Sequence, residues 1–158
     1  MYIRPIAQQD NVELAELIRK VFREFGIDRP GTVYTDPTTY QLYELFLMPG
    51  SVYWVAVENE ELIGGCGIYP TPGLPKGYAE LVKFHVGSVS RDKGVGKILL
   101  QQSIRSAREL GYKQLYLESF PELEKAVSMY FREGFHSLTV SMGNSGHTAC
   151  TMWMSLTL

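Results

Sequence analysis

The sequence predicts an α+β fold of mixed α/β character, with one central mixed sheet that is mostly antiparallel, about seven strands and about four flanking helices. Two observations predict it. A hairpin pattern occupies the first half, where the apolar runs Val52–Val57 and Leu62–Tyr69 flank a turn at Asn59-Glu60. Later apolar runs are separated by helical patterns long enough to connect parallel strands.

Each further element has its own local signal. Short apolar runs bounded by turn residues indicate strands, and apolar stripes spaced by three and four residues indicate helices. Outside the hairpin, the expected strands are Tyr2–Ile6, Tyr78–Val86, Gln114–Glu118, Phe135–Val140 and Ala149–Leu156. The expected helices begin at Asp10 or Asn11, at Thr38 or Thr39, at Ile98, and at a capping box formed by Ser119 and Glu122; they end at Gly26, Leu47, Leu110 and Gly134.

Length and composition limit the function classes. The chain has 158 residues, of which 45% are hydrophobic, so we expect a single domain over residues 1–158. A net charge of −2 argues against a nucleic-acid surface, and no apolar run approaches the roughly 20 residues of a membrane span. The N-terminal residues lack the pattern of a signal peptide, and Cys66 and Cys150 form no CxxC pair. We therefore expect a cytoplasmic protein, with a cross-link between the two cysteines left open.

The segment Arg91–Gly96 is the most informative in the chain. It follows a strand-like run and opens a helical one. A glycine-containing turn at a helix N-terminus exposes backbone N–H groups to an anion, and the helix dipole adds partial positive charge. Arg91, Lys93 and Lys97 add full charges beside it. These features predict a site for a phosphate or pyrophosphate; a tight turn that only packs the helix on the sheet is the alternative.

Two familiar phosphate motifs do not fit this segment. A P-loop requires Ser or Thr after Gly-Lys, but Gly96-Lys97 is followed by Ile98. A dinucleotide fingerprint requires a third glycine where Leu99 stands.

The remaining pattern, Arg91-x-x-Gly94-x-Gly96, resembles the R/Q-x-x-G-x-G/A motif of the GCN5-related N-acetyltransferase (GNAT) superfamily, of the small bacterial single-domain type. Two further segments support the resemblance, which covers about residues 51–158. They are Glu80-Leu81-Val82 in the preceding strand and Ala126 to Phe135, which resembles A-x-x-x-Y-x-x-x-G-F. One position departs from the family: Leu123 stands where Asn is frequent, which puts one polar cofactor contact in doubt.

The resemblance implies a sheet splayed between its fourth and fifth strands, acetyl-CoA as co-substrate and no metal. The turn amides would hold the pyrophosphate, and the edge of the fourth strand would pair with the pantetheine arm. The implied cofactor-binding residues are Phe84, His85, Val86, Arg91, Asp92, Lys93, Gly94, Val95, Gly96, Lys97 and Ser128. Independently, His85, His136 and His147 have no metal-ligand spacing.

The resemblance also implies the catalytic residues. Glu80 is the expected base that takes a proton from the acceptor amine, with Glu118 as the second candidate. Tyr130 is the expected acid for the leaving thiolate. Each has an alternative: Glu80 and Glu118 as strand carboxylates, and Tyr130 as a core aromatic, since it continues the stripe of Leu123 and Val127. The implied reaction is direct transfer of an acetyl group to a primary amine in a ternary complex.

The acceptor site is less defined. Tyr34, Glu118 and His147 are the candidate substrate residues, and the loop around Tyr34 also carries Asp28 and Asp36, which suit a cationic amine. A nucleophilic pair of His147 and Cys150 is disfavoured, because residues three apart on a strand face opposite sides. A non-catalytic acyl-CoA-binding module is the second function hypothesis. A homodimer through an exposed strand edge also stays open.

Overall fold

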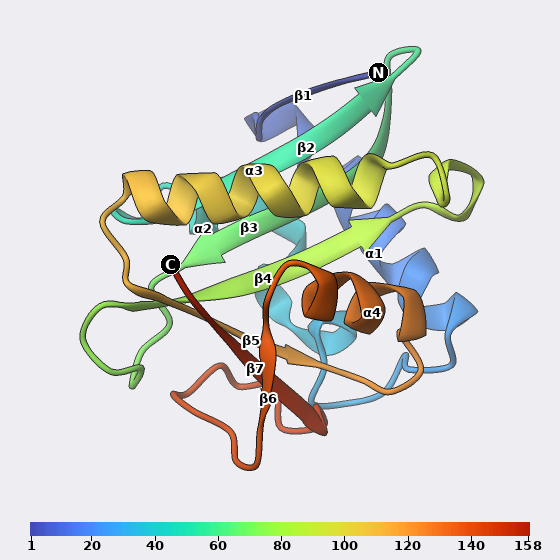
Figure 1. The fold of residues 1–158 in the computed structure, drawn as a ribbon. Coiled ribbons are helices and arrows are strands. Elements are labelled where there is room, and N and C mark those ends of the chain that lie inside the picture. Colours follow the sequence, from blue (N-terminus) through green and yellow to red (C-terminus); the bar gives the residue numbers. More distant parts are fainter.

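The computed structural model describes residues 1–158 and contains one sheet of seven strands, in the order β1-β2-β3-β4-β5-β7-β6 (Figure 1). The strands are β1 Tyr2–Pro5, β2 Val52–Glu58, β3 Glu61–Tyr69, β4 Tyr78–Val86, β5 Gln114–Ser119, β6 His136–Leu138 and β7 Met152–Thr157. All neighbouring strands are antiparallel except β4 and β5, which are parallel. The predicted mixed, mostly antiparallel sheet is confirmed.

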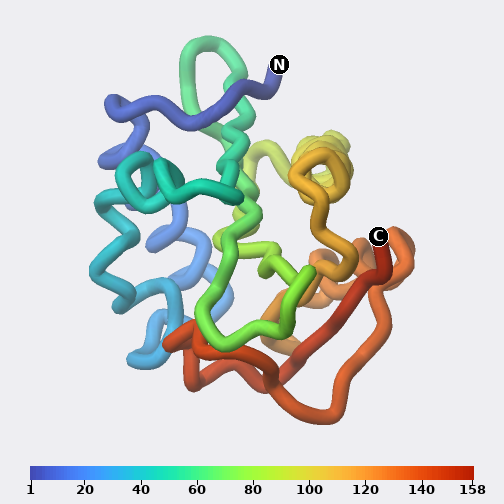
Figure 2. Tube along the Cα trace, turned by 90° about the vertical axis from the view of Figure 1, so that its left-hand side faces the viewer, coloured from blue at the N-terminus to red at the C-terminus, as the bar shows by residue number.

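Helices cover both faces of the sheet. The four α-helices are α1 Asn11–Glu24, α2 Leu42–Leu45, α3 Val95–Glu109 and α4 Glu124–Arg132. Figure 2 shows α1 and α2 on one face and α3 on the other. The alternation of side chains along β2 explains the two cores: Val55 and Val57 pack under α1, whereas Ala56 packs under α3.

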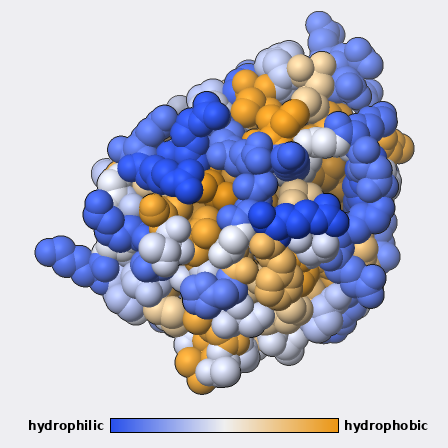
Figure 3. Space-filling view, in the orientation of Figure 1, coloured by the Kyte–Doolittle hydropathy of each residue, from blue (hydrophilic) through white to orange (hydrophobic).

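The outer surface of α3 is polar, as expected of an amphipathic helix. Its inner face buries Leu99, Leu100 and Ile104, and its outer face carries Lys97 and Arg105. Figure 3 shows hydrophilic residues over much of this face of the molecule, with hydrophobic residues in separate patches. No helix combines the length and apolar character needed to cross a membrane.

Five elements differ clearly from the predictions. The helix expected from Thr38 or Thr39 to Leu47 is instead the 3-10 turns Val33–Thr35 and Pro37–Tyr40 followed by the single turn of α2. Asp36 causes the early start, because its carboxylate accepts a hydrogen bond from the Thr38 amide at 2.9 Å and caps the second 3-10 turn. The last two strands are also shorter than expected.

The other two differences are at the starts of α3 and α4. Helix α3 begins at Val95, three residues before the expected Ile98, because Gly94 takes the left-handed conformation with φ 81° directly before it. Helix α4 begins at Glu124, so the expected capping box at Ser119 is wrong: Ser119 is the last residue of β5. Ser119 therefore ends a strand and does not begin a helix.

Strands β4 and β5 separate soon after they meet. Their pairing covers only Tyr78–Glu80 of β4 and Gln114–Tyr116 of β5. On its other edge, β4 bulges, because two residues, Lys83 and Phe84, lie opposite the single Cys66 of β3. Lys83 takes φ 52°, and its carbonyl accepts a hydrogen bond from the Tyr53 hydroxyl at 2.7 Å. The splay predicted between the fourth and fifth strands is thus confirmed.

Candidate active site

The turn before α3 combines two glycines with different physical roles. Gly94 has open space around it but needs its positive φ. Gly96 lies inside the helix, where an added Cβ would come within 3.1 Å of Met129 and 3.3 Å of Phe84. The first intrahelical bond runs from the Ile98 amide to the Gly94 carbonyl at 3.1 Å. The amides of residues 95–97 thus precede the helical ladder and are available to an anion.

The three cationic side chains beside this turn differ in whether they are already paired within the protein. The Arg91 guanidinium turns toward α1: it lies 2.6 Å from Glu24 and 4.8 Å from the ring centre of Phe25, and it donates to the Val86 carbonyl at 3.0 Å. Lys93 and Lys97 are exposed. Of the expected cofactor cations, the two lysines are therefore open and Arg91 is engaged in holding the turn against α1.

Lys125 is a residue of this region that the sequence patterns did not indicate. Its ammonium lies 2.6 Å from the Asp92 carboxylate, so it joins the turn to the first turn of α4. Both side chains are more than two-thirds exposed, which makes this a weak ion pair. A phosphate bound at the turn would compete with Asp92 for Lys125.

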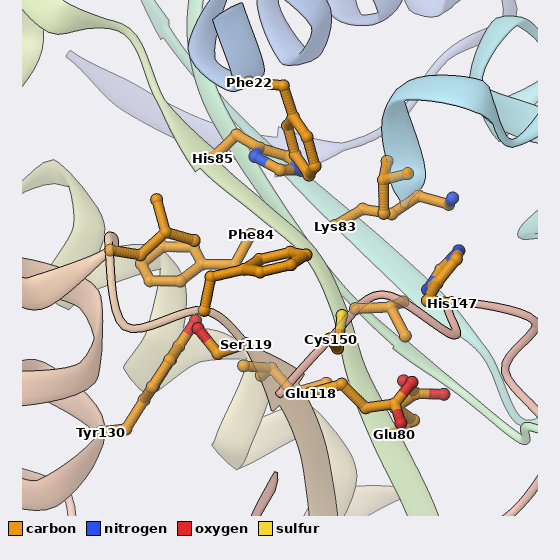
Figure 4. Close-up of a pocket in the computed structure, with 15 residues that line it drawn as sticks. Phe22, Glu80, Lys83, Phe84, His85, Glu118, Ser119, Tyr130, His147 and Cys150 are labelled. Atoms are coloured by element: carbon orange, nitrogen blue, oxygen red, sulfur yellow. The ribbon is translucent and has the colours of Figure 1, made fainter. Parts of the chain in front are cut away.

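A first cavity, defined here as cavity 1, lies where β4 and β5 separate and encloses about 540 Å³ of space, part of it open to solvent (Figure 4). Most of its lining is apolar. It is lined by Phe22, Val33, Glu80, Leu81, Val82, Lys83, Phe84, His85, Glu118, Ser119, Phe120, Leu123, Tyr130, His147 and Cys150. The expected residues Phe84, His85, Glu80 and Tyr130 thus meet in one cavity, whereas Val86 and Ser128 lie outside its lining.

A second cavity, cavity 2, is adjacent and mostly polar, with about 570 Å³ of space, again partly open to solvent. It is lined by Asp36, Thr38, Leu45, Tyr69, Thr71, Pro72, Glu80, Val82, Asn144, Ser145 and His147. Glu80, Val82 and His147 line both cavities. A group in one cavity would therefore meet a group in the other next to Glu80.

Glu80 is buried, with 3% of its surface exposed, and it accepts a hydrogen bond from the Thr71 hydroxyl. Burial raises the pKa of Glu80 to about 7, and the negative charge of Glu118 adds to this, against the opposing effects of Thr71 and Lys83. A carboxylate with a pKa near neutrality is a stronger base than an ordinary glutamate and is still substantially ionised at pH 7. Glu80 thus has the protonation behaviour of a general base.

Glu118 has a different environment. One of its oxygens accepts a hydrogen bond from the Tyr116 hydroxyl at 2.8 Å, and the other accepts one from the Ser145 hydroxyl. The Tyr116 oxygen in turn accepts from the Met142 amide at 3.0 Å. Glu118 therefore anchors the loop between β6 and β7 over the site, and both its oxygens are engaged.

Asp36, Lys83 and His147 form a polar group that joins three distant segments, with Lys83 buried and the other two partly buried. The Asp36 Oδ2 atom lies 3.0 Å from Lys83 Nζ and 3.0 Å from His147 Nε2. These partners, with hydrogen bonds from Thr38, hold the pKa of Asp36 well below its usual range despite burial. Burial lowers the pKa of Lys83, against the attraction of Asp36 and Glu80. Sequence reasoning missed Lys83, which has no local signal.

Backbone hydrogen bonds add to the closure of the β6–β7 loop. The Asn144 amide donates to the Pro72 carbonyl at 2.8 Å, and the Ala149 amide donates to the Gly31 carbonyl at 3.0 Å. The loop thus contacts the segments before α2 and before β4, and it completes cavity 2.

Tyr34, by contrast, lines neither cavity. Its ring lies under the Arg19 guanidinium, 4.1 Å from ring centre to carbon, and its carbonyl accepts a hydrogen bond from Arg19 at 2.9 Å. The structure therefore brings Glu118 and His147 together near Glu80 but leaves Tyr34 against α1.

Tyr130 is both a core aromatic and a cavity residue. Its ring centre lies 5.9 Å from Phe84 and 5.7 Å from Phe135. Burial holds the pKa of its phenol far above the usual value, so the hydroxyl keeps its proton at neutral pH. Tyr130 can therefore pack as a core aromatic and still offer a protonated hydroxyl as a lining residue of cavity 1.

The two cysteines are free thiols. Cys66 is fully buried, and burial raises its pKa to about 12. Cys150 lines cavity 1, where burial and the charges of Glu118 and Glu80 raise its pKa to about 12. A thiol with such a pKa is almost entirely protonated at pH 7 and a poor nucleophile. His147 also points its Nε2 at Asp36, away from the role of a thiol-activating base.

The sequence comparison decides the family. The pattern of the acetyltransferase (GNAT) family matches residues 13–135. The chain belongs to the GNAT family. This GNAT protein is 35% identical over 153 residues to the uncharacterized N-acetyltransferase YjgM of Escherichia coli (strain K12), a match that covers 96% of this chain and 92% of YjgM. The predicted family and its N-acetyltransferase activity are confirmed; the acceptor is not identified.

Solved structures share the fold. A GNAT acetyltransferase from Staphylococcus aureus Mu50 superposes with a TM-score of 0.87 at 20% identity, covering 99% of this chain and 98% of that one. The PaiA N-acetyltransferase from Thermoplasma acidophilum, determined in complex with coenzyme A, superposes with a TM-score of 0.73 at 18% identity, covering 99% and 98%. A structural relative with the same fold thus binds coenzyme A.

Proposed function

We propose that this GNAT protein transfers an acetyl group from acetyl-CoA to a primary amine by direct attack, with both substrates bound at once. The observation that carries the proposal is the junction of two cavities of opposite character at Glu80, whose pKa lies at about 7. An apolar cavity suits an acyl chain, and a polar cavity with carboxylates suits a cationic amine. Direct contact between their contents is what an acyl transfer requires.

The residues present fit acetyl-CoA. The free amides at the start of α3, with Lys93 and Lys97 beside them, suit a diphosphate. The unpaired edge of β4 beyond Glu80 opens into cavity 1 and suits the amide groups of the pantetheine arm. When bound, acetyl-CoA would supply a thioester carbonyl that an amine can attack.

Glu80 and Tyr130 are the proposed proton-transfer residues. An acceptor amine with an ordinary pKa of about 10.4 is protonated at neutral pH and must lose a proton to become a nucleophile. The Glu80 carboxylate accepts that proton, directly or through water. As the new C–N bond forms and the C–S bond breaks, the Tyr130 hydroxyl donates a proton to the departing sulfur. The phenolate regains its proton in exchange with solvent, and Glu80 releases the amine proton.

Two properties of the site support direct transfer over a covalent intermediate. Cys150 is a cavity thiol, but its pKa of about 12 keeps it in the protonated form. Glu80 lines both cavities, so it can take the proton of an amine that attacks the thioester directly, with no acyl group passing through a protein side chain.

The experiment is thiol release from acetyl-CoA with a panel of small amines and peptides. We expect release of free coenzyme A with at least one acceptor, and kcat/KM that rises with pH through about 7. Glu80→Gln and Tyr130→Phe should each reduce kcat by about 100-fold or more, as loss of a general acid or base does. Tyr112→Phe is the matched control for Tyr130, since it removes a tyrosine hydroxyl that donates to the Gly50 carbonyl at 2.7 Å, outside both cavities.

Two outcomes would contradict the proposal. Wild-type rates in both catalytic variants would remove the roles of Glu80 and Tyr130. Tight binding of acetyl-CoA with no turnover on any amine would instead favour a protein that only binds acyl-CoA.

A further inference from the structure

The walls of the two cavities carry an excess of negative charge. Three carboxylates line them: Asp36 in cavity 2, Glu118 in cavity 1 and Glu80 in both. Lys83 is the only lysine or arginine in either lining. The His85 ring is neutral, because burial, with a smaller effect of Lys83, lowers its pKa to about 3. The space in which an acceptor must bind therefore favours cations over anions.

Lys83 is not available to an anion that enters this space. Only 3% of its side chain is exposed, and its ammonium lies 3.0 Å from the Asp36 carboxylate. Arg29 does not replace it. The Arg29 guanidinium lies over the Phe120 ring, 5.3 Å from the ring centre, and the residue is exposed and lines neither cavity. A carboxylate that entered with the acceptor would thus find no free cation in these linings.

Three polar atoms converge where the two cavities meet. An oxygen of Glu80, an oxygen of Glu118 and a ring nitrogen of His147 lie within 4.8 Å of one another. A nitrogen atom between them can lie about 2.8 Å from each, which is the length of a charge-assisted hydrogen bond. A primary ammonium group has three N–H donors to match. Figure 4 shows Glu80 and His147 on the side of the cavity away from Tyr130.

The hydrogen bonds already present at these atoms leave room for an ammonium group. Thr71 donates to one oxygen of Glu80, which leaves the other. Both oxygens of Glu118 accept hydrogen bonds, but a carboxylate oxygen has two lone pairs and can accept a second donor. One nitrogen of His147 lies 3.0 Å from Asp36, and a neutral ring that donates there has its other nitrogen free to accept.

We propose that the acceptor is a primary amine whose own carbon bears no carboxylate, and that Glu80 and Glu118 exclude free α-amino acids from the site. The inference rests on the proposed function, because it names the acceptor class of the same reaction. A carboxylate on the carbon that bears the amine would lie within about 6 Å of both glutamates, where like charges repel. Alkylamines and the N-terminal amines of peptides meet the condition. Glu80 is the base, whereas Glu118 acts on specificity.

The test measures thiol release from acetyl-CoA with amines in matched pairs that differ by one carboxylate group or its charge. The pairs are ethanolamine with serine, tyramine with tyrosine, and alaninamide with alanine. Any other amine that proves to be an acceptor is compared with the α-amino acid that corresponds to it. We expect kcat/KM, corrected to equal concentrations of unprotonated amine, to be at least about tenfold higher for the member without the carboxylate.

Two variants test the charges that carry the inference. Glu118→Gln removes a negative charge with little change of shape and should lower the preference within each pair by about threefold or more. Lys83→Met removes the only cation of the linings and should raise the preference. Glu122→Gln is the matched control, because its carboxylate is exposed and outside both cavities, and the preference should not change. A purely structural role for Glu118 would lower kcat/KM for both members of a pair alike.

The outcomes separate this inference from the proposed function. If no amine is acetylated, the proposed function fails. If amines are acetylated and the amino acid of a pair reacts as well as its partner or better, the exclusion is overturned. A preference that is unchanged in Glu118→Gln overturns the role of Glu118. Should Glu118→Gln not fold, Lys83→Met supplies the charge test through the opposite shift, and an unchanged preference there overturns the inference.

Discussion

The ammonium of Lys83 lies 3.0 Å from the carboxylate of Asp36, and the two side chains are unequally buried, with 3% and 18% of their surface exposed. The pair connects the bulge of β4 to the capped 3-10 turn before α2. It therefore joins a lining residue of cavity 1, Lys83, to a lining residue of cavity 2, Asp36.

Substitution of either partner of this pair should have unequal effects on stability. Asp36→Asn leaves the buried Lys83 ammonium without its counter-charge and should lower the free energy of unfolding by roughly 3 kcal/mol or more. Lys83→Met removes the more buried charge, and Asp36 keeps its contacts with Thr38 and His147, so the loss should be smaller. Urea unfolding of both variants at neutral pH measures the difference; equal losses would contradict the asymmetry.

The raised pKa of Glu80 predicts a specific pH dependence of stability. The folded state holds the Glu80 proton with a pKa of about 7, against an ordinary value of 4.5. The stability that this protonation provides is complete below about pH 4.5 and is lost as the pH rises through about 7. Glu80→Gln stays neutral, so relative to wild type it should gain up to about 3 kcal/mol over this range.

Parallel urea titrations at about pH 5 and about pH 8 would measure this gain. Glu122→Gln serves as the control, because it removes an exposed carboxylate outside both cavities. A difference between wild type and Glu80→Gln that does not vary with pH would mean that Glu80 titrates normally.

The two glycines of the α3 turn should respond differently to alanine. Gly94→Ala places a side chain at φ 81° and should destabilise the protein by about 1–2 kcal/mol, although nothing would clash with it. Gly96→Ala adds a methyl group within 3.1 Å of the flexible end of Met129 and 3.3 Å of the Phe84 ring, while alanine favours the helix by about 1 kcal/mol. The two effects oppose each other, so the net change should be smaller than that of Gly94→Ala. Thermal unfolding checks the order, and a larger loss for Gly96→Ala would refute it.

Arg91 is paired with Glu24, whereas Lys93 and Lys97 are exposed. We therefore expect substitution of Arg91 to change stability and substitution of the lysines to change cofactor binding. Arg91→Ala and Glu24→Gln should each destabilise the protein by up to about 1 kcal/mol, as partly exposed ion pairs do. Lys93→Ala and Lys97→Ala should leave stability unchanged and weaken coenzyme A binding, more so at low salt. Calorimetric binding at two salt concentrations distinguishes them. Unaltered affinity in both lysine variants would exclude these lysines from the phosphate site.

The sequence predicted best the parts of the site that are continuous in the chain. The strand ending at Val86, the turn and the start of a helix have local signals, because glycine conformations and strand patterns are set by neighbours. Glu80 became a candidate through the family resemblance of the strand that carries it. The prediction extended to a mixed, mostly antiparallel sheet with a splay between the fourth and fifth strands, but not to the spatial order of the strands.

The rest of the site depends on contacts between distant segments. His147 meets Asp36 across 111 positions of sequence, and no local pattern carries that information. The helix expected at Thr38 was wrong because Asp36 and Pro37 favour a 3-10 turn that places Asp36 beside Lys83. The capping box at Ser119 was wrong because pairing with β7 extends β5 to that residue. In each case tertiary pairing outweighed a local preference.

The loop of residues 139–151 supplies Asn144, Ser145 and His147 to cavity 2, and His147 and Cys150 to cavity 1. Its anchors, Glu118, Asp36, and the carbonyls of Gly31 and Pro72, are separate from the amides at the start of α3. Replacement of this one segment would consequently change the lining of cavity 2 and leave the amides at the start of α3 in place.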